Sequence, residues 1–224
     1  MTDKLSQKVR TQAALTRFPT PLIAKNPLSK EEKIEKIAKN IRSIMEILGL
    51  DVGHSSLKKT PERVAAMYVN EVFSGLDLDA FPSVALFEQQ TNPTLPPQMV
   101  FTRVSLVSFC EHHLVPMIGT ACIAYLPKDK IIGLSKLSRI ARYFAARPQL
   151  QERLTSQIGD SLETILGHKN VAVCITAKHT CVVARGAKDE SAETTTLYTD
   201  GLFHTSIEYR KEFLDMVHSG TERR

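Results

Sequence analysis

Apolar and polar residues recur with different periods along the chain, and these periods separate helical from extended stretches. After residue 29, apolar side chains recur every three or four residues, from Ile34 to Leu48, as in an amphipathic helix. Ser29 and Glu32 form a capping box at the start, and Gly49 is a stop signal at the end. The pattern therefore predicts a surface helix between Ser29 and Gly49.

A second helix is predicted shortly after the first. Thr60 is expected to be its N-cap and Pro61 its first helical residue, with one apolar face continuing until Gly75. After a short possible strand at 84–87, the sequence is rich in Gln, Thr, Asn and Pro as far as Pro97, which predicts a surface loop.

Beyond this loop the period changes to two, which is typical of strands with one buried face. The first two strands are expected to form a hairpin whose connecting turn carries His112 and His113. Strands are predicted at 99–109, 118–126, 170–183 and 193–203. Helices are predicted from Ser135, as N-cap, to about Ala146, around Leu154 to Gly167, and at 207–217. The order of elements predicts an α+β protein.

The composition is that of an ordinary globular chain. Of the 224 residues, 42% are hydrophobic and 24% are charged, and no apolar run approaches the roughly 20 residues that span a bilayer. Residues 1–8 contain no apolar signal-peptide core, so we expect a cytoplasmic protein without a membrane partner. We expect a mobile N-terminal arm at 1–28, where three prolines disfavour a long helix, a helical segment at 29–82 and the main domain at 83–224.

The charge pattern favours a small polyanion over nucleic acid as a partner. The formal net charge is +5, but basic residues are interleaved with acidic ones instead of being massed in one block. We therefore expect no nucleic-acid binding.

The densest group of metal-binding side chains lies in the predicted hairpin turn. Cys110 and His113 have a spacing that lets a tight turn direct both donors at one ion, and Cys181 can supply a third ligand from a distant segment. His112 and His113 are adjacent and cannot both point the same way, and spacing does not decide which one binds the metal. Three protein ligands would leave zinc an open position for water, whose pKa falls to about 7, as in catalytic sites.

The remaining cysteines have a simpler interpretation. Cys122 and Cys174 lie in alternating apolar strands, so we expect them to be small buried side chains.

If 170–183 is one strand, His179 and Cys181 share a face, and His179 lies near the metal. Oxidation of Cys110 and Cys181 to a disulfide is a further possibility, and it would expel the metal.

Two other groups are candidates for binding a nucleotide. Ser135, Lys136 and Arg139 combine a helix start with cations three residues apart, which suits a phosphate, and Arg185 can add a third cation. Taken alone, such cations more often form a solvated face. Gln151 and Glu152 are by default an ordinary exposed pair, although a carboxylate can accept two N–H bonds from a guanine edge.

Together these motifs resemble the GTP cyclohydrolase I family over about residues 29–214. Any single motif is weak, but four in the same order are specific. They are Cys110-Glu111-His112-His113, the segments 133–139 and 147–154, and His179-Thr180-Cys181.

The resemblance implies a tunnelling fold in which antiparallel strands of several subunits close a barrel, assembled as a homodecamer of two pentamers with shared active sites. It implies hydrolysis of GTP to formate and 7,8-dihydroneopterin triphosphate, the first step toward folate and related pterins. It also implies roles for single residues. The implied metal ligands are Cys110, His113 and Cys181, for Zn²⁺. The implied catalytic residues are His112, His179 and Ser135. The implied substrate contacts are Gln151, Glu152, Lys136, Arg139 and Arg185, with Ser135 also near the triphosphate or ribose.

Two kinds of alternative remain open at this point. The first is a related enzyme of the same fold, such as a pyruvoyl-tetrahydropterin synthase-like lyase or a nitrile reductase of queuosine synthesis. The lyase would be expected to bind zinc with three histidines, whereas two thiols and one imidazole fit this chain better. The other is a zinc-stabilised module that binds a nucleotide without turnover.

Overall fold

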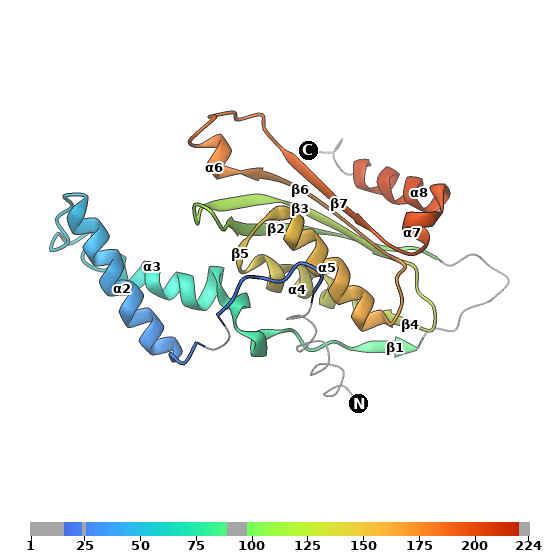
Figure 1. The fold of residues 1–224 in the computed structure, drawn as a ribbon, viewed down its shortest axis with the longest axis horizontal. Coiled ribbons are helices and arrows are strands. Elements are labelled where there is room, and N and C mark those ends of the chain that lie inside the picture. The colour runs from blue at the N-terminus through green and yellow to red at the C-terminus, as the bar shows by residue number, and fades with distance from the viewer. Residues whose placement is uncertain (1–15, 24–25, 89–97, 220–224) are drawn as a thin grey trace.

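The computed structural model describes residues 16–23, 26–88 and 98–219 (Figure 1). The described helices are α2 (Lys30–Ile47), α3 (Thr60–Met67), α4 (Leu134–Ala145), α5 (Gln151–Leu166), α6 (Thr180–Val183), α7 (Leu202–Thr205) and α8 (Ile207–His218), with short turns η1 (Tyr68–Val72), η2 (Ser74–Leu76) and η3 (Leu78–Ala80). The described strands are β1 (Leu86–Glu88), β2 (Val100–Cys110), β3 (Pro116–Tyr125), β4 (Lys130–Ile132), β5 (Pro148–Gln149), β6 (Val171–His179) and β7 (Thr194–Thr199). The predicted α+β class is confirmed.

Helices α2 and α3 pack against each other as a hairpin that extends from one end of the molecule (Figure 1). The capping box of α2 is present, because the Ser29 side chain accepts from the N–H of Glu32 and the Glu32 side chain accepts from the N–H of Ser29. In α3, however, Thr60 is the first helical residue and Lys59 is the N-cap, so the predicted cap was placed one residue late. The helix continues as a π-helical turn, η1, instead of running unbroken to Gly75.

The main sheet has five strands in the order β5-β2-β3-β6-β7. Its three long contacts are antiparallel, whereas the short β5 pairs with β2 in parallel. The predicted hairpin is confirmed, with Val107 opposite Ile118 in the β2–β3 pair. A separate two-stranded ribbon joins β1 to β4.

Successive residues of the strands point to opposite faces of the sheet, and each face packs in its own hydrophobic core. Ala121, Ile123 and Tyr125 face the core that α4 and α5 cover, whereas Cys122 and Ala124 face a smaller core that α7 and α8 close. Cys122 and Cys174 are directly opposite in the β3–β6 pair and each is 3% exposed, so both are buried side chains as predicted. In Figure 1, α4 and α5 lie on one side of the sheet and α8 lies on the other.

Several predicted boundaries were wrong, because local turns replace the ends of regular elements. The run at 170–183 is a strand only as far as His179, after which α6 begins. The run at 193–203 ends as a strand at Thr199, and α7 follows. The α4 helix begins at Leu134 with Gly133 as N-cap, so Ser135 lies inside the first turn and does not cap it.

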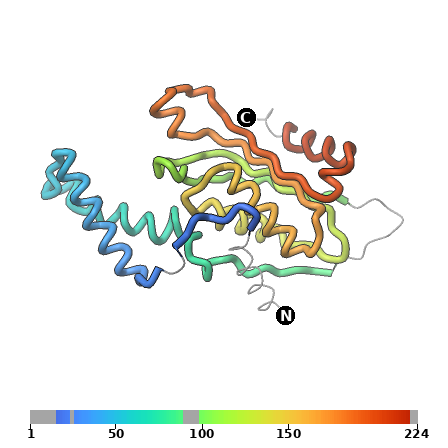
Figure 2. The backbone as a smooth tube through the Cα atoms, in the orientation of Figure 1, coloured from blue at the N-terminus to red at the C-terminus, as the bar shows by residue number. Residues whose placement is uncertain are grey.

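The predicted mobile arm lies partly outside the described residues, which include 16–23 and 26–28 of it. Within the described part, Arg17 forms an ion pair with Asp160 of α5, with 2.6 Å between Nη2 and Oδ1. Figure 2 shows this segment, in blue, crossing α5. Among the described residues, no helix is both long and apolar enough to span a membrane.

The close approach of β3 to β6 requires glycine at position 119. An added Cβ would lie 2.1 Å from the carbonyl oxygen of Thr176, which is backbone and cannot turn away. We predict that Gly119→Ala lowers the free energy of unfolding by about 1–3 kcal/mol, the usual cost of overpacking. Urea unfolding followed by circular dichroism measures this. Gly133→Ala is the control, because its Cβ would meet nothing closer than 3.5 Å. Equal stability of the two variants would contradict the prediction.

Candidate active site

The turn between β2 and β3 is closed by main-chain hydrogen bonds around Cys110. The Cys110 N–H donates to Val115 O at 2.9 Å, and the Leu114 N–H donates to Cys110 O at 2.8 Å. Leu114 has a φ of 51°, in the left-handed region that a tight turn requires. The Glu111 N–H donates to Gln149 O of β5 at 3.0 Å, so the turn is also held from the side.

The second segment of the site is α6, a single helical turn directly after β6. The pairing of Met117 with His179 brings the end of β6 beside the start of β3. The Thr180 hydroxyl donates to Pro116 O at 2.7 Å and fastens α6 to the hairpin. This turn, and not the predicted continuous strand, carries Cys181.

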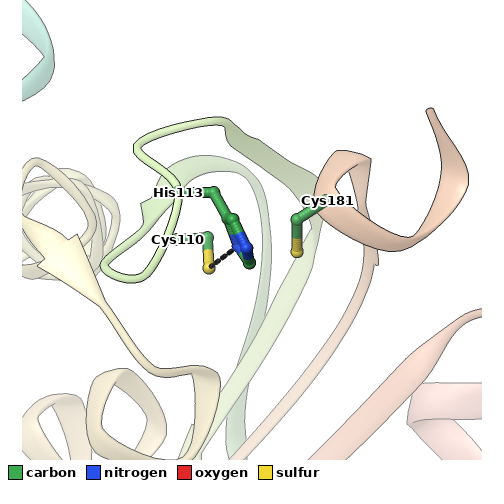
Figure 3. A group of neighbouring side chains, drawn as sticks. All are labelled: Cys110, His113 and Cys181. Atoms are coloured by element: carbon green, nitrogen blue, oxygen red, sulfur yellow. Dashed lines mark hydrogen bonds between the residues drawn. The ribbon is translucent and has the colours of Figure 1, made fainter. Parts of the chain in front are cut away.

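Cys110, His113 and Cys181 form one cluster of three donors (Figure 3). Their ligand atoms all lie within 4.8 Å of one another, and Cys110 Sγ is 3.9 Å from His113 Nδ1. Figure 3 shows the Cys110 and Cys181 sulfurs turned toward the imidazole of His113. The geometry thus selects His113 over His112 for the cluster, the choice that spacing left open.

The cluster fits a zinc ion chemically. Burial and the neighbouring Cys110 thiol raise the pKa of Cys181, while the charge of Arg185 opposes this shift. Two thiols side by side resist joint ionisation unless a cation lies between them. Two thiolates and one imidazole are common zinc ligands, and three protein ligands leave one position open.

His112 lies outside the cluster and faces solvent. Its side chain is 63% exposed, and its Nε2 is 4.0 Å from Oε1 of Glu111. Arg185 approaches the cluster from the far side of His113, with 2.9 Å between Nη1 and His113 Nε2. These placements put one free imidazole and one guanidinium beside the three donors.

His179 is held by Gln151, the first residue of α5. The Gln151 side-chain N–H₂ donates to Ile175 O at 3.0 Å and Thr194 O at 2.9 Å. These carbonyl partners define the amide orientation, so Gln151 Oε1, 2.8 Å from His179 Nε2, must accept a hydrogen bond from the Nε2–H. Burial lowers the pKa of His179, and the charge of Glu152 opposes this shift.

The default interpretation of Gln151 and Glu152 as an exposed pair was wrong for the first residue. Gln151 is 2% exposed, whereas Glu152 is exposed to solvent. Sequence reasoning also missed a partner of the turn, Arg153, which forms an ion pair with Glu111. Nothing in the spacing of these charges, 42 residues apart, indicated their contact.

Within one chain, the cations of α4 are not brought to the cluster. The end of α4 lies beside β2, where the Ser108 hydroxyl donates to Ala145 O at 2.7 Å. Ser135 lies ten residues earlier, which is about 15 Å along the helix axis at 1.5 Å per residue. Arg139 instead lines a groove with Glu71 and Ser74 of the N-terminal segment. Ser135, Lys136 and Arg139 therefore form a separate group.

A curved antiparallel sheet with two helices on one face and a three-donor site at one end defines a tunnelling-fold protein with a candidate metal centre. A family model described as GTP cyclohydrolase I matches residues 37–218. The chain therefore belongs to the GTP cyclohydrolase I family. The family's members are hydrolases, so the chain is an enzyme of this type.

Similar proteins span nearly the whole chain. GTP cyclohydrolase 1 of Aeromonas salmonicida is 48% identical over 217 residues, covering 96% of this chain and 98% of that protein. GTP cyclohydrolase 1 of Vibrio vulnificus is 48% identical over 210 residues, covering 93% of this chain and 95% of its own. A solved structure of an archaeosine synthase QueF-Like protein shows 13% identity and a TM-score of 0.38, over 46% of this chain and 94% of that one.

The three-donor cluster predicts a pattern of metal content among variants. Replacing Cys110, His113 or Cys181 with alanine should each lower bound zinc well below one ion per chain, because two remaining ligands hold zinc poorly. Zinc content after desalting is measured by atomic emission spectroscopy. Cys174→Ala is the matched control, because this thiol is buried on the opposite side of the sheet. Equal zinc loss in the control would mean that the metal is bound elsewhere or that the fold is damaged.

Proposed function

We propose that the chain converts GTP and water to 7,8-dihydroneopterin triphosphate and formate, using zinc held by Cys110, His113 and Cys181. The three-donor cluster, with a free imidazole beside it, is the observation that carries this proposal. The full-length similarity to proteins named GTP cyclohydrolase 1 supports the choice of substrate. The product leads toward folate and other pterins.

When bound, zinc would supply Lewis acidity that activates water for hydrolysis of the guanine imidazole ring. Its binding to His113 would also affect Arg185. Arg185 lies 2.9 Å from His113 Nε2, and the imidazole has only one lone pair to share. A metal-bound His113 would no longer accept from Arg185, which leaves the guanidinium available to a triphosphate.

His112 is proposed to donate a proton to N7 of guanine as the ring opens. A general acid must reach the substrate, and this side chain is exposed beside the three donors. The carboxylate of Glu111, 4.0 Å from Nε2, is placed to orient the ring. His112 thus has the access and the neighbour that the role requires.

His179 is proposed to act as the second acid/base group. Its Nε2–H is committed to Gln151, so in the neutral ring Nδ1 is the nitrogen with a free lone pair. One defined tautomer favours proton acceptance at one defined atom. Ribose opening and the later rearrangement need such transfers, and the Ser135 hydroxyl is proposed to assist them.

Guanine recognition is assigned to the start of α5. The exposed Glu152 carboxylate can accept two N–H bonds from the guanine edge. Because the Gln151 side chain already holds His179 and two carbonyls, we infer that Gln151 faces guanine with its main-chain N–H. No side chain of the described residues caps this helix start, so its N–H groups are available to a ligand.

The triphosphate is assigned to Lys136, Arg139 and Arg185, which requires more than one chain. Lys136 and Arg139 lie nine and six residues before Ala145, which is about 14 Å and about 9 Å along the helix axis at 1.5 Å per residue. We propose a homodecamer of two pentamers, in which the α4 cations of one subunit complete the site of its neighbour. The exposed edge strand β7 offers main-chain groups through which sheets of adjacent subunits can join in a barrel.

The two thiol ligands also indicate the cellular compartment in which the protein works. Cys110 and Cys181 lie close enough to be oxidised together, and a disulfide would remove two zinc ligands. A reducing compartment protects such a site. We therefore propose that the protein works in the cytoplasm.

The deciding experiment measures formate released from GTP. We predict that zinc-loaded protein releases formate, that a chelator stops release, and that added zinc restores it. His112→Ala should lower the rate at least about 10²-fold while keeping zinc and oligomeric state, because it removes a general acid. GTP binding without formate release, even with zinc, would overturn the proposal and favour a nucleotide-binding module.

A site shared between subunits predicts complementation. His112→Ala and Lys136→Ala should each be nearly inactive, but oligomers reassembled from a mixture should regain activity, because some sites receive both native residues. Activity and size are measured together by size-exclusion chromatography with an assay of each fraction. A mixture of His112→Ala with His179→Ala is the control, since one chain contributes both residues to each site and no native site can form. Recovery in the control alone, or an active monomer fraction, would contradict shared sites.

A further inference from the structure

We propose that Arg153 is a positioning residue, which through Glu111 holds the β2–β3 turn against the start of α5. The ring of Phe18, in the N-terminal segment, covers the guanidinium of this ion pair. The inference rests on the proposed function, because the turn carries His112 and His113. It assigns a task in the site to residues that contact neither the metal donors nor, in the proposed binding mode, the substrate.

Arg153 and Glu111 meet at two points, and we call this ion pair the brace. Arg153 Nη1 donates to Glu111 Oε2, and Nη2 lies 3.4 Å from Oε1, so both arms of the guanidinium face the carboxylate. The side chains are 6% and 22% exposed. A two-point contact restricts rotation as well as distance, and partial burial protects it from screening.

The ion pair lies next to both segments that carry the proposed acid/base residues. Glu111 lies between Cys110 and His112, and its N–H is held by Gln149 O at 3.0 Å. Arg153 lies two residues after Gln151, which holds His179. The first turn of α5 therefore holds both segments. Arg153 holds the β2–β3 turn, which carries His112, and Gln151 holds His179. This arrangement sets the separation of the two proposed acid/base groups.

The guanidinium depends on few partners. The Nε of Arg153 is buried without a hydrogen-bond acceptor among the described residues. One face of the guanidinium is covered by the Phe18 ring, whose centroid lies 4.8 Å from Cζ. The charge is thus balanced by one carboxylate and one aromatic face, and removing the carboxylate leaves a largely buried cation without its counter-charge.

The covering segment is itself anchored to α5. Arg17 binds Asp160 through its main-chain N–H, 2.9 Å from Oδ2, and its Nε, 2.7 Å from Oδ1. Gln157 Nε2 donates to Phe18 O at 3.0 Å. These contacts hold the Phe18 ring over Arg153 and exclude water, which strengthens the ion pair by lowering the local dielectric constant.

The test compares full-length, zinc-loaded variants by two independent readouts. Glu111→Gln keeps the shape of the side chain but removes its charge. Arg153→Lys keeps the charge but removes the planar guanidinium that contacts the carboxylate at two points. We expect kcat to fall about 10- to 100-fold, as for a catalytic group displaced by about 1 Å. KM for GTP should change less than about threefold, with zinc content unchanged. The double variant should be no worse than Glu111→Gln alone, because Arg153→Lys removes a contact that Glu111→Gln has already removed.

The second readout does not depend on turnover. Hydrogen exchange of the Glu111 and Leu114 amides, both hydrogen-bonded in the turn, should become about tenfold faster or more when a charged hydrogen bond is lost. Arg103→Lys is the matched control, since Arg103 also lies over an aromatic ring, Phe101 at 5.8 Å, and donates to Val217 O on the α8 side of the sheet. It should alter neither kcat nor exchange in the turn.

Phe18→Ala provides a variant that leaves both charges in place. It should make kcat sensitive to salt between low and physiological ionic strength, because the uncovered ion pair becomes screened. Unchanged exchange and kcat in Glu111→Gln and Phe18→Ala would overturn the proposal, as would an activity loss that follows zinc loss. If native protein released no formate, the proposed function would fail, while the exchange measurement would still decide whether the brace exists.

Discussion

The position of β3 between β2 and β6 is the constraint on which the site depends. Ser108 and His179 both pair with Met117, so the two segments that follow them, the hairpin turn and α6, must emerge at the same end of the sheet. A shift of one residue in either pair would move a cysteine away from the cluster and turn alternate side chains to the other face. The metal donors are therefore held by the hydrogen-bond register of the sheet, and the two helices behind it protect that register by burying one face.

Much of this arrangement was predictable because it follows from periodicity. Alternation in the strands and the three- and four-residue spacing in α2, α5 and α8 have direct physical causes, so their existence was predicted correctly. The hairpin turn followed from the two strands that flank it. Cys122 and Cys174 were separated from the candidate ligands by the same reasoning, since their neighbours are apolar and both proved buried. The choice of His113 over His112 was not predictable from spacing, because it depends on the turn that Leu114 makes at positive φ.

The remaining features depend on contacts between residues far apart in sequence. The burial of Gln151 results from carbonyl groups of β6 and β7, which local composition does not reveal. The helical turn at Cys181 replaces a strand because Thr180 bonds to Pro116, 64 residues earlier. Arg153 is similar, since a charged residue in a helix is normally expected at the surface. In each case a polar side chain is held by a partner distant in sequence, and a pattern of hydrophobic residues carries no information on that partner.

The separation of the α4 cations from the three donors connects the fold to the proposed assembly. Nothing within α4 brings these cations closer, because the helix is rigid and its Ala145 end, not its cation-bearing start, bonds to Ser108, two residues before Cys110. Residues that serve one reaction must meet, so the cations either have no part in it or act on the site of another subunit. The sheet favours the second possibility, since β7 leaves one edge exposed and exposed edges pair readily with other strands. A chain built this way would acquire its activity by assembly, and the brace between Glu111 and Arg153 would keep the half-site of each subunit in position until its neighbour completes it.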